Sequence, residues 1–350
     1  MAKLRIGVLY EFWWDEDEER GPDARPKRQA PDVDVQAVYD TLKKIGHNPV
    51  FLRLDGSRAS LGELADSETD LIFNMAESYG GDDTLDYNIA AYLELLGRRF
   101  TGTGSRGLYL AQDKALAKKL FSFHGIHTPY FTTVYRGRTE HSHDIQFPVI
   151  VKPAREDGSI GIHFGAVCAS IKELMDRIDY IHAQFDSPAL IEEYIEGREL
   201  YVGVIGNQEP EALPVIELDL SQLPEGVPKI AGAEVKWEEG TDAYEKTKPF
   251  FPKDLPEETV TRLQQSAVQA YQALQLRDYG RIDFRLAQDG TVHVLEVNPN
   301  PYLLPTAEFA MAAGESGRDY DDVVGEIVTQ AMGRYGVSLS KDGNGRGNGG

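Results

Sequence analysis

Residues 280–300 read GRIDFRLAQDGTVHVLEVNPN, two runs of alternating polar and apolar residues on either side of an Asp-Gly dipeptide. Asp-Gly between such runs is the strongest short-range signal of a β-hairpin. A two-residue turn predicts three opposed pairs on one face: Asp283 with Glu296, Arg281 with Asn298, and Arg285 with Val294. The other face would pack on the core through Ile282, Phe284, Leu286, Leu295 and Val297, with His293.

The charged face of this hairpin has the composition of a metal site. Two carboxylates directly opposite each other lie only about 5 Å apart at Cβ, which is destabilising unless a cation offsets them. Asp283 and Glu296 form such a pair, Asn298 adds an amide oxygen on the same face, and the prolines that follow end the strand. Mg²⁺ takes oxygen ligands from one or two carboxylates and completes its shell with phosphates and water. The alternative is a solvated sheet face whose acids are balanced by the two arginines of the hairpin.

Composition limits the class of protein. The chain has 350 residues, 41% of them hydrophobic, which is enough for two or three packed domains. Its net charge of −21 argues against nucleic acid as a partner, because phosphate binding needs a basic surface. The single cysteine, Cys168, excludes an internal disulfide and a cysteine metal cluster. No stretch approaches the ~18 apolar residues of a membrane span, and we expect a cytoplasmic protein that contacts no membrane.

The first third of the chain predicts an open parallel α/β domain that ends near residue 105. LRIGVLY (4–10), NPVFLRL (48–54) and TDLIFNM (69–75) are typical of buried strands, and RRFTG (98–102) of a short one. Residues 32–47 predict an amphipathic helix capped by Asp32. Strand, helix and strand in this order imply a right-handed crossover and a parallel sheet. The acidic stretch 11–30 lacks periodicity and predicts a loop.

Two further segments follow. Residues 106–190 predict a helix in AQDKALAKKLFSFHG, strands in PYFTTVY and FPVIVKP, and a glycine-bearing loop in EDGSIGIHFGAV. Residues 191–335 begin with the strand-like run ALIEEYIEGRELYVGVIG and end with the metal-binding hairpin and its following helices. Residues 336–350 are polar and glycine-rich, and we expect a disordered tail.

Four motifs in this order resemble the ATP-grasp superfamily, and within it the D-alanine–D-alanine ligases: TGTG with AQDKALAKKLFSFHGIHTP, FPVIVKPAREDGSIGI, ALIEEYIEGREL, and GRIDFRL with LEVNPNP. The resemblance extends from about residue 70 to about residue 330, and four spaced motifs are more specific than one glycine loop. It implies an α/β protein of the ATP-grasp class. The N-terminal domain (1–105) would precede two ATP-grasp subdomains (106–190 and 191–335) that hold ATP between them.

The resemblance also assigns roles to single residues. Lys114 and Lys152 resemble the lysines that hold the ATP phosphates, and Lys236 resembles a mobile-loop lysine over the γ-phosphate. Glu192 resembles the residue that reads the adenine amino group, with Ile195 beside it. Further assignments are Glu199 to the ribose and Arg281 to the reacting carboxylate, with Arg281, Lys236 and the glycine-loop residue Ser159 as catalytic residues. Asp283, Glu296 and Asn298 are assigned to Mg²⁺. Each motif alone is equally typical of a solvated strand end, an exposed edge or an ordinary turn.

The implied reaction moves the γ-phosphoryl group of ATP onto a carboxylate, and an amine then attacks the acyl phosphate. Because two anions meet, Mg²⁺ and lysines must neutralise them. The resemblance implies two Mg²⁺ ions, for which Mn²⁺ can substitute. A loop near residues 229–245 would exclude water by closing over the site. The resemblance implies small amino-acid-like substrates as partners, and the net charge already argues against nucleic acid. Because members of the family usually form homodimers, the resemblance also implies a homodimer.

The amino-acid half of the family pattern is altered. RQAPDVDV lacks the glutamate that holds the first substrate's ammonium, and Asp32 is the nearest acid. NMAESYGGDDT lacks the family histidine and has Glu77 nearby. The loop REDGSIG has Gly158 where the family has its first serine, Trp237 follows the loop lysine, and Tyr302 replaces a glycine. Together with Trp13 and Trp14, the last two aromatics predict a larger pocket, although the tryptophan loop would equally pack on the core.

Three functions fit these residues. The first is a carboxylate–amine ligase for amino-acid-like substrates other than two D-alanines. The second is a genuine D-alanine–D-alanine ligase of peptidoglycan synthesis with a divergent pocket. The third is an ATP-binding protein without turnover, and other ATP-grasp chemistry such as phosphoryl or thioester transfer also stays open.

Overall fold

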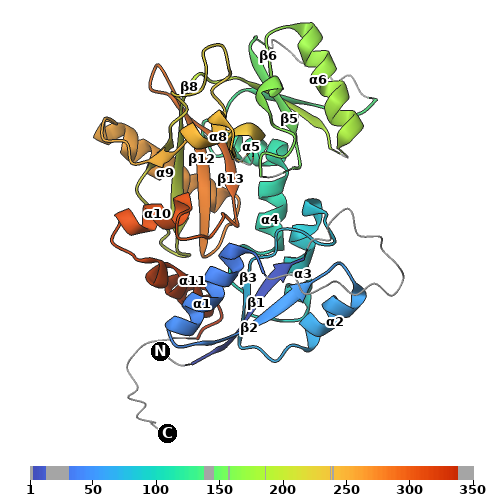
Figure 1. The fold of residues 1–350 in the computed structure, drawn as a ribbon, viewed down its shortest axis with the longest axis vertical. Coiled ribbons are helices and arrows are strands. Elements are labelled where there is room, and N and C mark those ends of the chain that lie inside the picture. Colours follow the sequence, from blue (N-terminus) through green and yellow to red (C-terminus); the bar gives the residue numbers. More distant parts are fainter. Residues whose placement is uncertain are drawn as a thin grey trace, which may run out of the picture.

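The computed structural model describes residues 3–12, 31–137, 146–156, 158–185, 187–236, 238 and 240–337. It has three β-sheets, each with helices packed against it (Figure 1). Trp13, Trp14 and Trp237, residues 13–30 of the predicted acidic loop and most of the predicted tail lie outside the described residues, whereas Glu11 belongs to a strand. None of the described helices is both long and apolar enough to cross a membrane.

The N-terminal sheet is parallel, with strand order β2-β1-β3. Its strands and helices are β1 (Arg5–Glu11), α1 (Val33–Lys44), β2 (Asn48–Leu54), α2 (Arg58–Asp66), β3 (Leu71–Asn74), the 3₁₀ helix η1 (Asp83–Leu85) and α3 (Asp86–Leu95). The predicted crossover and helix α1 are confirmed, with Val35, Val38 and Leu42 buried. Asp32 occupies the N-cap position but makes no side-chain cap bond. The predicted strand at residues 98–102 is reduced to one bridge, between Ile72 and Phe100.

The second sheet is antiparallel, in the order β4-β7-β5-β6. Two helices precede it, and it is covered by a third. These elements are α4 (Ser105–Gln112), α5 (Lys114–Phe123), β4 (Phe131–Val134), β5 (Val149–Pro153), the 3₁₀ helix η2 (Phe164–Ala166), β6 (Val167–Cys168), α6 (Ile171–Gln184) and β7 (Ala189–Glu193). The single helix predicted for AQDKALAKKLFSFHG is two helices, because Asp113 leaves the helical conformation and its side chain caps α5 through the Leu116 N–H.

The third sheet runs β11-β10-β8-β12-β13, with β9 paired to β8. Its elements are β8 (Gly197–Ile205), β9 (Glu211–Ala212), β10 (Ile216–Leu218), α7 (Ala233–Lys236), α8 (Asp242–Lys246), β11 (Pro249–Phe250), α9 (Glu257–Ala273), β12 (Tyr279–Ala287), β13 (Val292–Asn298), α10 (Glu308–Glu315) and α11 (Tyr320–Arg334). Helix α9 covers the apolar face of this sheet, and α11 lies beside α1 of the N-terminal domain (Figure 1).

The hairpin β12–β13 confirms the central pairs Asp283–Glu296 and Arg281–Asn298. The predicted pair Arg285–Val294 is wrong, because Arg285 lies opposite His293 and Val294 is buried in the core. The loop has three residues, 288–290, and Leu295 forms a β-bulge between Asp283 and Phe284. The two departures from the predicted register offset each other, so the pairs predicted to form the metal site keep their partners. Leu295 was also placed wrongly, since it lines a pocket and not the core.

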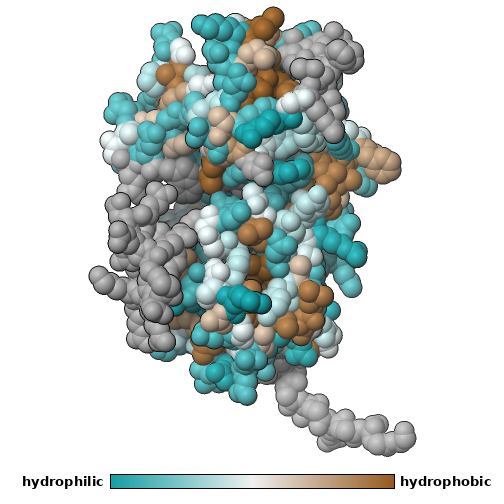
Figure 2. Space-filling model, turned by 90° about the vertical axis from the view of Figure 1, so that its right-hand side faces the viewer, coloured by the Kyte–Doolittle hydropathy of each residue, from teal (hydrophilic) through white to brown (hydrophobic). Residues whose placement is uncertain are grey.

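The side of the molecule drawn in Figure 2 is mixed in character, with apolar side chains in scattered groups among hydrophilic ones. Scattered apolar residues are ordinary on a protein surface. The residues considered for function lie instead in the interior, in a pocket between the second and third sheets.

Candidate active site

A cleft of about 540 Å³, including the part open to solvent, separates the second sheet from the third. Five of the predicted site residues line it: Lys152, Glu192, Ile195, Glu199 and Glu296. The other lining residues are Ile150, Ile162, Glu193, Tyr194, Ile230, Ala231, Arg285 and Leu295. Apolar walls with a few charged groups at fixed positions are typical of a small-molecule site.

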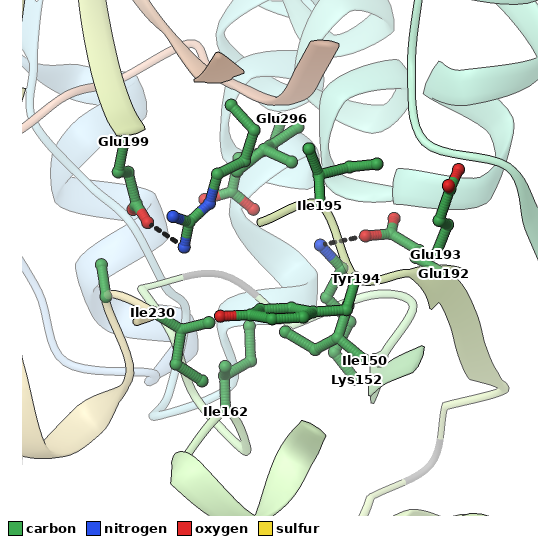
Figure 3. Close-up of a pocket in the computed structure, with 13 residues that line it drawn as sticks. Ile150, Lys152, Ile162, Glu192, Glu193, Tyr194, Ile195, Glu199, Ile230 and Glu296 are labelled. Atoms are coloured by element: carbon green, nitrogen blue, oxygen red, sulfur yellow. Dashed lines mark ion pairs between the residues drawn. The ribbon is translucent and has the colours of Figure 1, made fainter. Parts of the chain in front are cut away.

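Two ion pairs mark opposite ends of this pocket (Figure 3). At one end the Glu199 carboxylate lies 2.8 Å from an amino group of Arg285. At the other end Lys152 Nζ lies 2.8 Å from Glu192. The ring of Tyr194 lies between them in the view, and its hydroxyl accepts a hydrogen bond from the Lys229 N–H.

Glu192 is fully buried and has two lysine partners. Its second oxygen lies 2.9 Å from Nζ of Lys118, which is itself wholly buried and donates to the Thr128 hydroxyl. Burial would raise the pKa of Glu192, but the two lysines outweigh it and lower that pKa. Burial lowers the pKa of Lys118 to about 8, against the pull of Glu192. The carboxylate is therefore held ionised in the pocket wall.

Lys118 was missed from the sequence. It lies four residues after Lys114 on α5, so both lysines share one helix face, and both are buried. That spacing was the available signal, but a lysine on a helix is ordinarily solvated. Arg285 was considered only as a balancing charge, and its pairing with Glu199 follows from the register of β12 with β8.

The predicted metal ligands come together at the middle of β12 and β13. Asp283 is 2% exposed and lies opposite Glu296, with Asn298 two residues further along β13. Nδ2 of Asn298 is buried without a hydrogen-bond partner, and an exchange of its amide atoms would place an oxygen there instead. Among the described residues no group of three or more His, Cys, Asp or Glu is placed to hold a metal. Two carboxylates and an amide nevertheless fit Mg²⁺, which takes its remaining ligands from phosphates and water.

Cations surround this carboxylate pair. Lys114 Nζ lies 3.4 Å from Glu296, and Arg281 bonds both oxygens of Asp283, at 2.8 and 2.9 Å. Burial would raise the pKa of Glu296, but Lys114, Lys152 and Lys236 outweigh it and lower that pKa to about 2. Three lysines predicted to serve one phosphate chain therefore act on one carboxylate.

Two loops meet over the pocket. The glycine loop contains Gly158 and Ser159, both with positive φ angles of 60° and 65°. The Ser159 hydroxyl donates to the Ala231 carbonyl at 2.9 Å, and the Ala233 N–H donates to the Ile162 carbonyl at 2.8 Å. Ser159 thus joins the glycine loop to the segment that leads to Lys236, and its predicted catalytic role remains a prediction.

Glu234 strengthens the contact between the two loops. Its carboxylate accepts a hydrogen bond of 2.8 Å from the Phe164 N–H. Arg177 reaches the same loop from α6, where Nη2 bonds the Gly161 carbonyl and Nη1 lies 2.6 Å from His163. The glycine loop is therefore fixed from both subdomains, as a closed cover over the pocket requires.

The N-terminal domain contributes acids beyond the metal site. Glu11, at the end of β1, accepts a hydrogen bond of 3.1 Å from the Glu77 N–H. Burial raises the pKa of Glu11 to about 7, and Asp32 and Asp34 act in the same direction. Asp32 and Glu77, noted from the sequence as substitutes for family residues, therefore lie in one acidic neighbourhood.

We expect Glu11→Gln to stabilise the protein at pH 8 and to have little effect near pH 4.5. Because the native pKa of Glu11 is raised, the folded state holds its proton between pH 4.5 and 7 while the unfolded state loses it. Stability from this group is thus lost as the pH rises through that window, by roughly 1–3 kcal/mol. Thermal melts from pH 4.5 to 8 measure the difference between variant and wild type. The exposed Glu63→Gln is the control, and a difference that does not grow with pH would contradict the assignment.

A family model described as D-ala D-ala ligase C-terminus matches residues 120–329. The chain belongs to the D-alanine–D-alanine ligase family. It is an ATP-dependent carbon–nitrogen ligase of the ATP-grasp class, as the sequence predicts. The predicted fold class and the resemblance are both confirmed.

Three relatives illustrate the similarity. The chain is 34% identical to the uncharacterized protein y4sG of Sinorhizobium fredii (strain NBRC 101917 / NGR234), over 86% of this chain and 88% of that protein. It is 32% identical to a D-alanine–D-alanine ligase of Halalkalibacterium halodurans, over 85% and 92%. A D-alanine–D-alanine ligase of Bacillus anthracis, solved in complex with ATP, superposes with a TM-score of 0.69 over 95% of this chain and 98% of that chain. With 20% identity, that structure shows a shared fold.

Proposed function

We propose that this ligase joins a carboxylate to an amine through an acyl phosphate, and that its amino-acid-like substrates are not two D-alanines. The observation that carries the proposal is the order of charged residues along β12. Arg285 with Glu199 comes first, Asp283 with Glu296 next, and Arg281 last. Successive side chains on one face of a strand are about 6.6 Å apart, so a nucleotide lying along β12 would present its terminal phosphate near Arg281.

In this proposal the nucleotide lies in the pocket between the second and third sheets. Glu192 and Ile195 contact the base, and Glu199 contacts the ribose. Lys114, Lys152 and Lys236 bind the phosphates. Asp283, Glu296 and Asn298 hold Mg²⁺, which when bound neutralises charge on the phosphates.

The chemistry then proceeds beside Arg281. A substrate carboxylate oxygen takes the γ-phosphoryl group, which leaves ADP and an acyl phosphate. The amine nitrogen attacks the acyl carbon, the new C–N bond forms, and phosphate and a proton are released. Arg281 and the amides of the glycine loop would stabilise the oxyanion that develops. The loop contacts of Ser159 and Glu234 keep water from the acyl phosphate.

A genuine D-alanine–D-alanine ligase is the second candidate, because relatives of that name are up to 33% identical over most of the chain. Phosphate release from ATP and Mg²⁺, measured across D- and L-amino acids and their carboxamides, singly and in pairs, separates the two. We expect release with a pair other than two D-alanines and a product mass equal to the pair minus water. Release with D-alanine alone, yielding the dipeptide, would select the second candidate. Tight ATP binding without release for any pair would contradict both.

A further inference from the structure

Beyond the metal site, the sheet ends in a group of residues named here the acceptor end: Tyr279, Arg281, Asn300 and Glu308. Tyr279 and Arg281 continue the row of β12 away from the nucleotide pocket, and the Tyr279 hydroxyl donates to Asn300 at 2.7 Å. Whatever follows the terminal phosphate in the reaction must lie here. The charge of the acceptor end therefore bears on the second substrate.

Arg281 is the only arginine or lysine of the acceptor end so defined, and two acids already hold it. Its Nε and Nη2 bond the two oxygens of Asp283, and its Nη1 lies 3.4 Å from Glu308. The guanidinium carbon lies 4.8 Å from the centre of the Tyr201 ring. Only 12% of the Arg281 side chain is exposed. Arg281 thus contacts two carboxylates, and because Lys236 also acts on Asp283, Glu308 is the acid that Arg281 neutralises without a lysine beside it in this group.

Glu308 projects from the first turn of α10, where the helix dipole interacts favourably with negative charge. Its side chain is 26% exposed, more than that of Asp283, so it is the partner of Arg281 nearer to solvent. A second carboxylate approaching the outer side of the guanidinium would meet Glu308 at close range. Like charges brought together in this way cost several kcal/mol.

Acidic residues of the N-terminal segment, namely Asp32, Asp34 and Glu77, add to the negative charge of this region. Burial raises the pKa of Tyr279, and among the charges that add to this are Glu77 and Asp34. Burial also raises the pKa of Tyr302, with Asp34, Asp32 and Glu77 acting in the same direction. Glu308 of α10 thus contacts the acceptor end directly, and acids of the N-terminal segment add negative charge around Tyr279 and Tyr302.

We propose that the amine substrate carries no free carboxylate beside its nucleophilic nitrogen, and that Glu308 sets this specificity by occupying Arg281. This inference rests on the proposed ligase function. A carboxamide or another carboxyl-blocked amine suits the site, because its N–H donates to Glu308 where a carboxylate is repelled. Glu308 is therefore a specificity-determining residue that contacts the amine.

The test is a competition between two amines that differ in this group alone. Each acid of the panel receives ATP, Mg²⁺ and an equimolar mixture of alanine and alaninamide of the same configuration. The ratio of products by mass spectrometry gives the ratio of kcat/KM. We expect wild type to favour alaninamide at least about tenfold, and Glu308→Gln to lower that preference at least about tenfold, about 1.4 kcal/mol.

Glu326→Gln is the matched control. Glu326 is paired with Arg318 at 3.0 Å and is 30% exposed, close to the exposure of Glu308, but it lies on α11. It should keep the wild-type ratio. Glu308→Ala is the second variant if the glutamine form does not fold, and the wild-type ratio is informative by itself.

The outcomes separate this inference from the proposed function. Turnover with a wild-type ratio at or below one, or a ratio that Glu308→Gln leaves unchanged, overturns the inference while the ligase stands. No phosphate with any pair overturns the proposed function. In that case, alanine and alaninamide are titrated by calorimetry into the complex with Mg²⁺ and a non-hydrolysable ATP analogue. Tighter binding of alaninamide that depends on Glu308 supports the inference. Any other result overturns it.

Discussion

Glu296→Gln should lower ligase turnover by roughly 10³-fold while the fold is kept, since a bound metal contributes several kcal/mol to such reactions. Glutamine preserves the shape of the side chain but removes the charge that faces Asp283 across the hairpin. Glu296 has a pKa of about 2 because Lys114, Lys152 and Lys236 surround it, so it is ionised at any working pH. The variant therefore removes a permanent anion from the centre of the site.

Two measurements check this prediction. Phosphate release as a function of Mg²⁺ concentration reports turnover, and calorimetry of Mn²⁺ binding to the complex with a non-hydrolysable ATP analogue reports the metal directly. Thermal melts establish that the fold survives. Glu315→Gln, an exposed site on α10, is the control and should behave as wild type. Normal turnover and unchanged Mn²⁺ affinity in Glu296→Gln would remove Glu296 from the metal site.

The hairpin shows how far alternation in a sequence carries a structural prediction. Asp283 and Glu296 were paired correctly, yet the assumed two-residue turn was wrong. The loop has three residues, with Gly290 at φ 83°, and the bulge at Leu295 restores the register. Alternation predicts which residues of a regular strand share a face, but it does not report a bulge, and Val294 and Leu295 were therefore assigned to the wrong faces.

A segment far away in the sequence contacts β13 beside the bulge. The Val294 N–H donates to the His127 carbonyl at 2.8 Å, and the Val294 carbonyl accepts from the Thr128 hydroxyl at 2.9 Å. The free edge of β13 is thus bound at this one residue by the chain that follows α5. Such a contact depends on tertiary packing, and the sequence of β13 alone does not predict it.

The charged residues that line the pocket were predicted better than the residues that neutralise them. The resemblance to the ligase family assigned Lys152, Glu192 and Glu199 to one site, and all three line one pocket. The ion pairs of Glu192 with Lys118 and of Glu199 with Arg285 could not be predicted without knowing which faces of the helix and strands meet. The pairing of Glu308 with Arg281 spans a loop of irregular structure, and the sequence gives no register across it.

The second large effect is expected for Lys152→Met. Lys152 lies in β5, one residue before its end, lines the pocket between the second and third sheets, and bonds Glu192 at 2.8 Å. If it binds the ATP phosphates, its loss should weaken ATP binding by roughly 10- to 100-fold, because a hydrogen bond to a charged group contributes about 1.5–3 kcal/mol. It should also destabilise the fold by on the order of 3 kcal/mol, since Glu192 is fully buried and loses one of two cations.

A change in stability alone could weaken binding, and Lys118→Met separates the two effects. Lys118 is paired with the same carboxylate at 2.9 Å and is equally buried, but it lies behind Glu192 and does not line the pocket. Both variants should therefore melt earlier by similar amounts. Only Lys152→Met should lose most of its ATP affinity by calorimetry, whereas Lys118→Met should lose less than about tenfold. Equal losses in the two variants would mean that Lys152 serves the pocket only by neutralising Glu192, and its assignment to the phosphates would then be wrong.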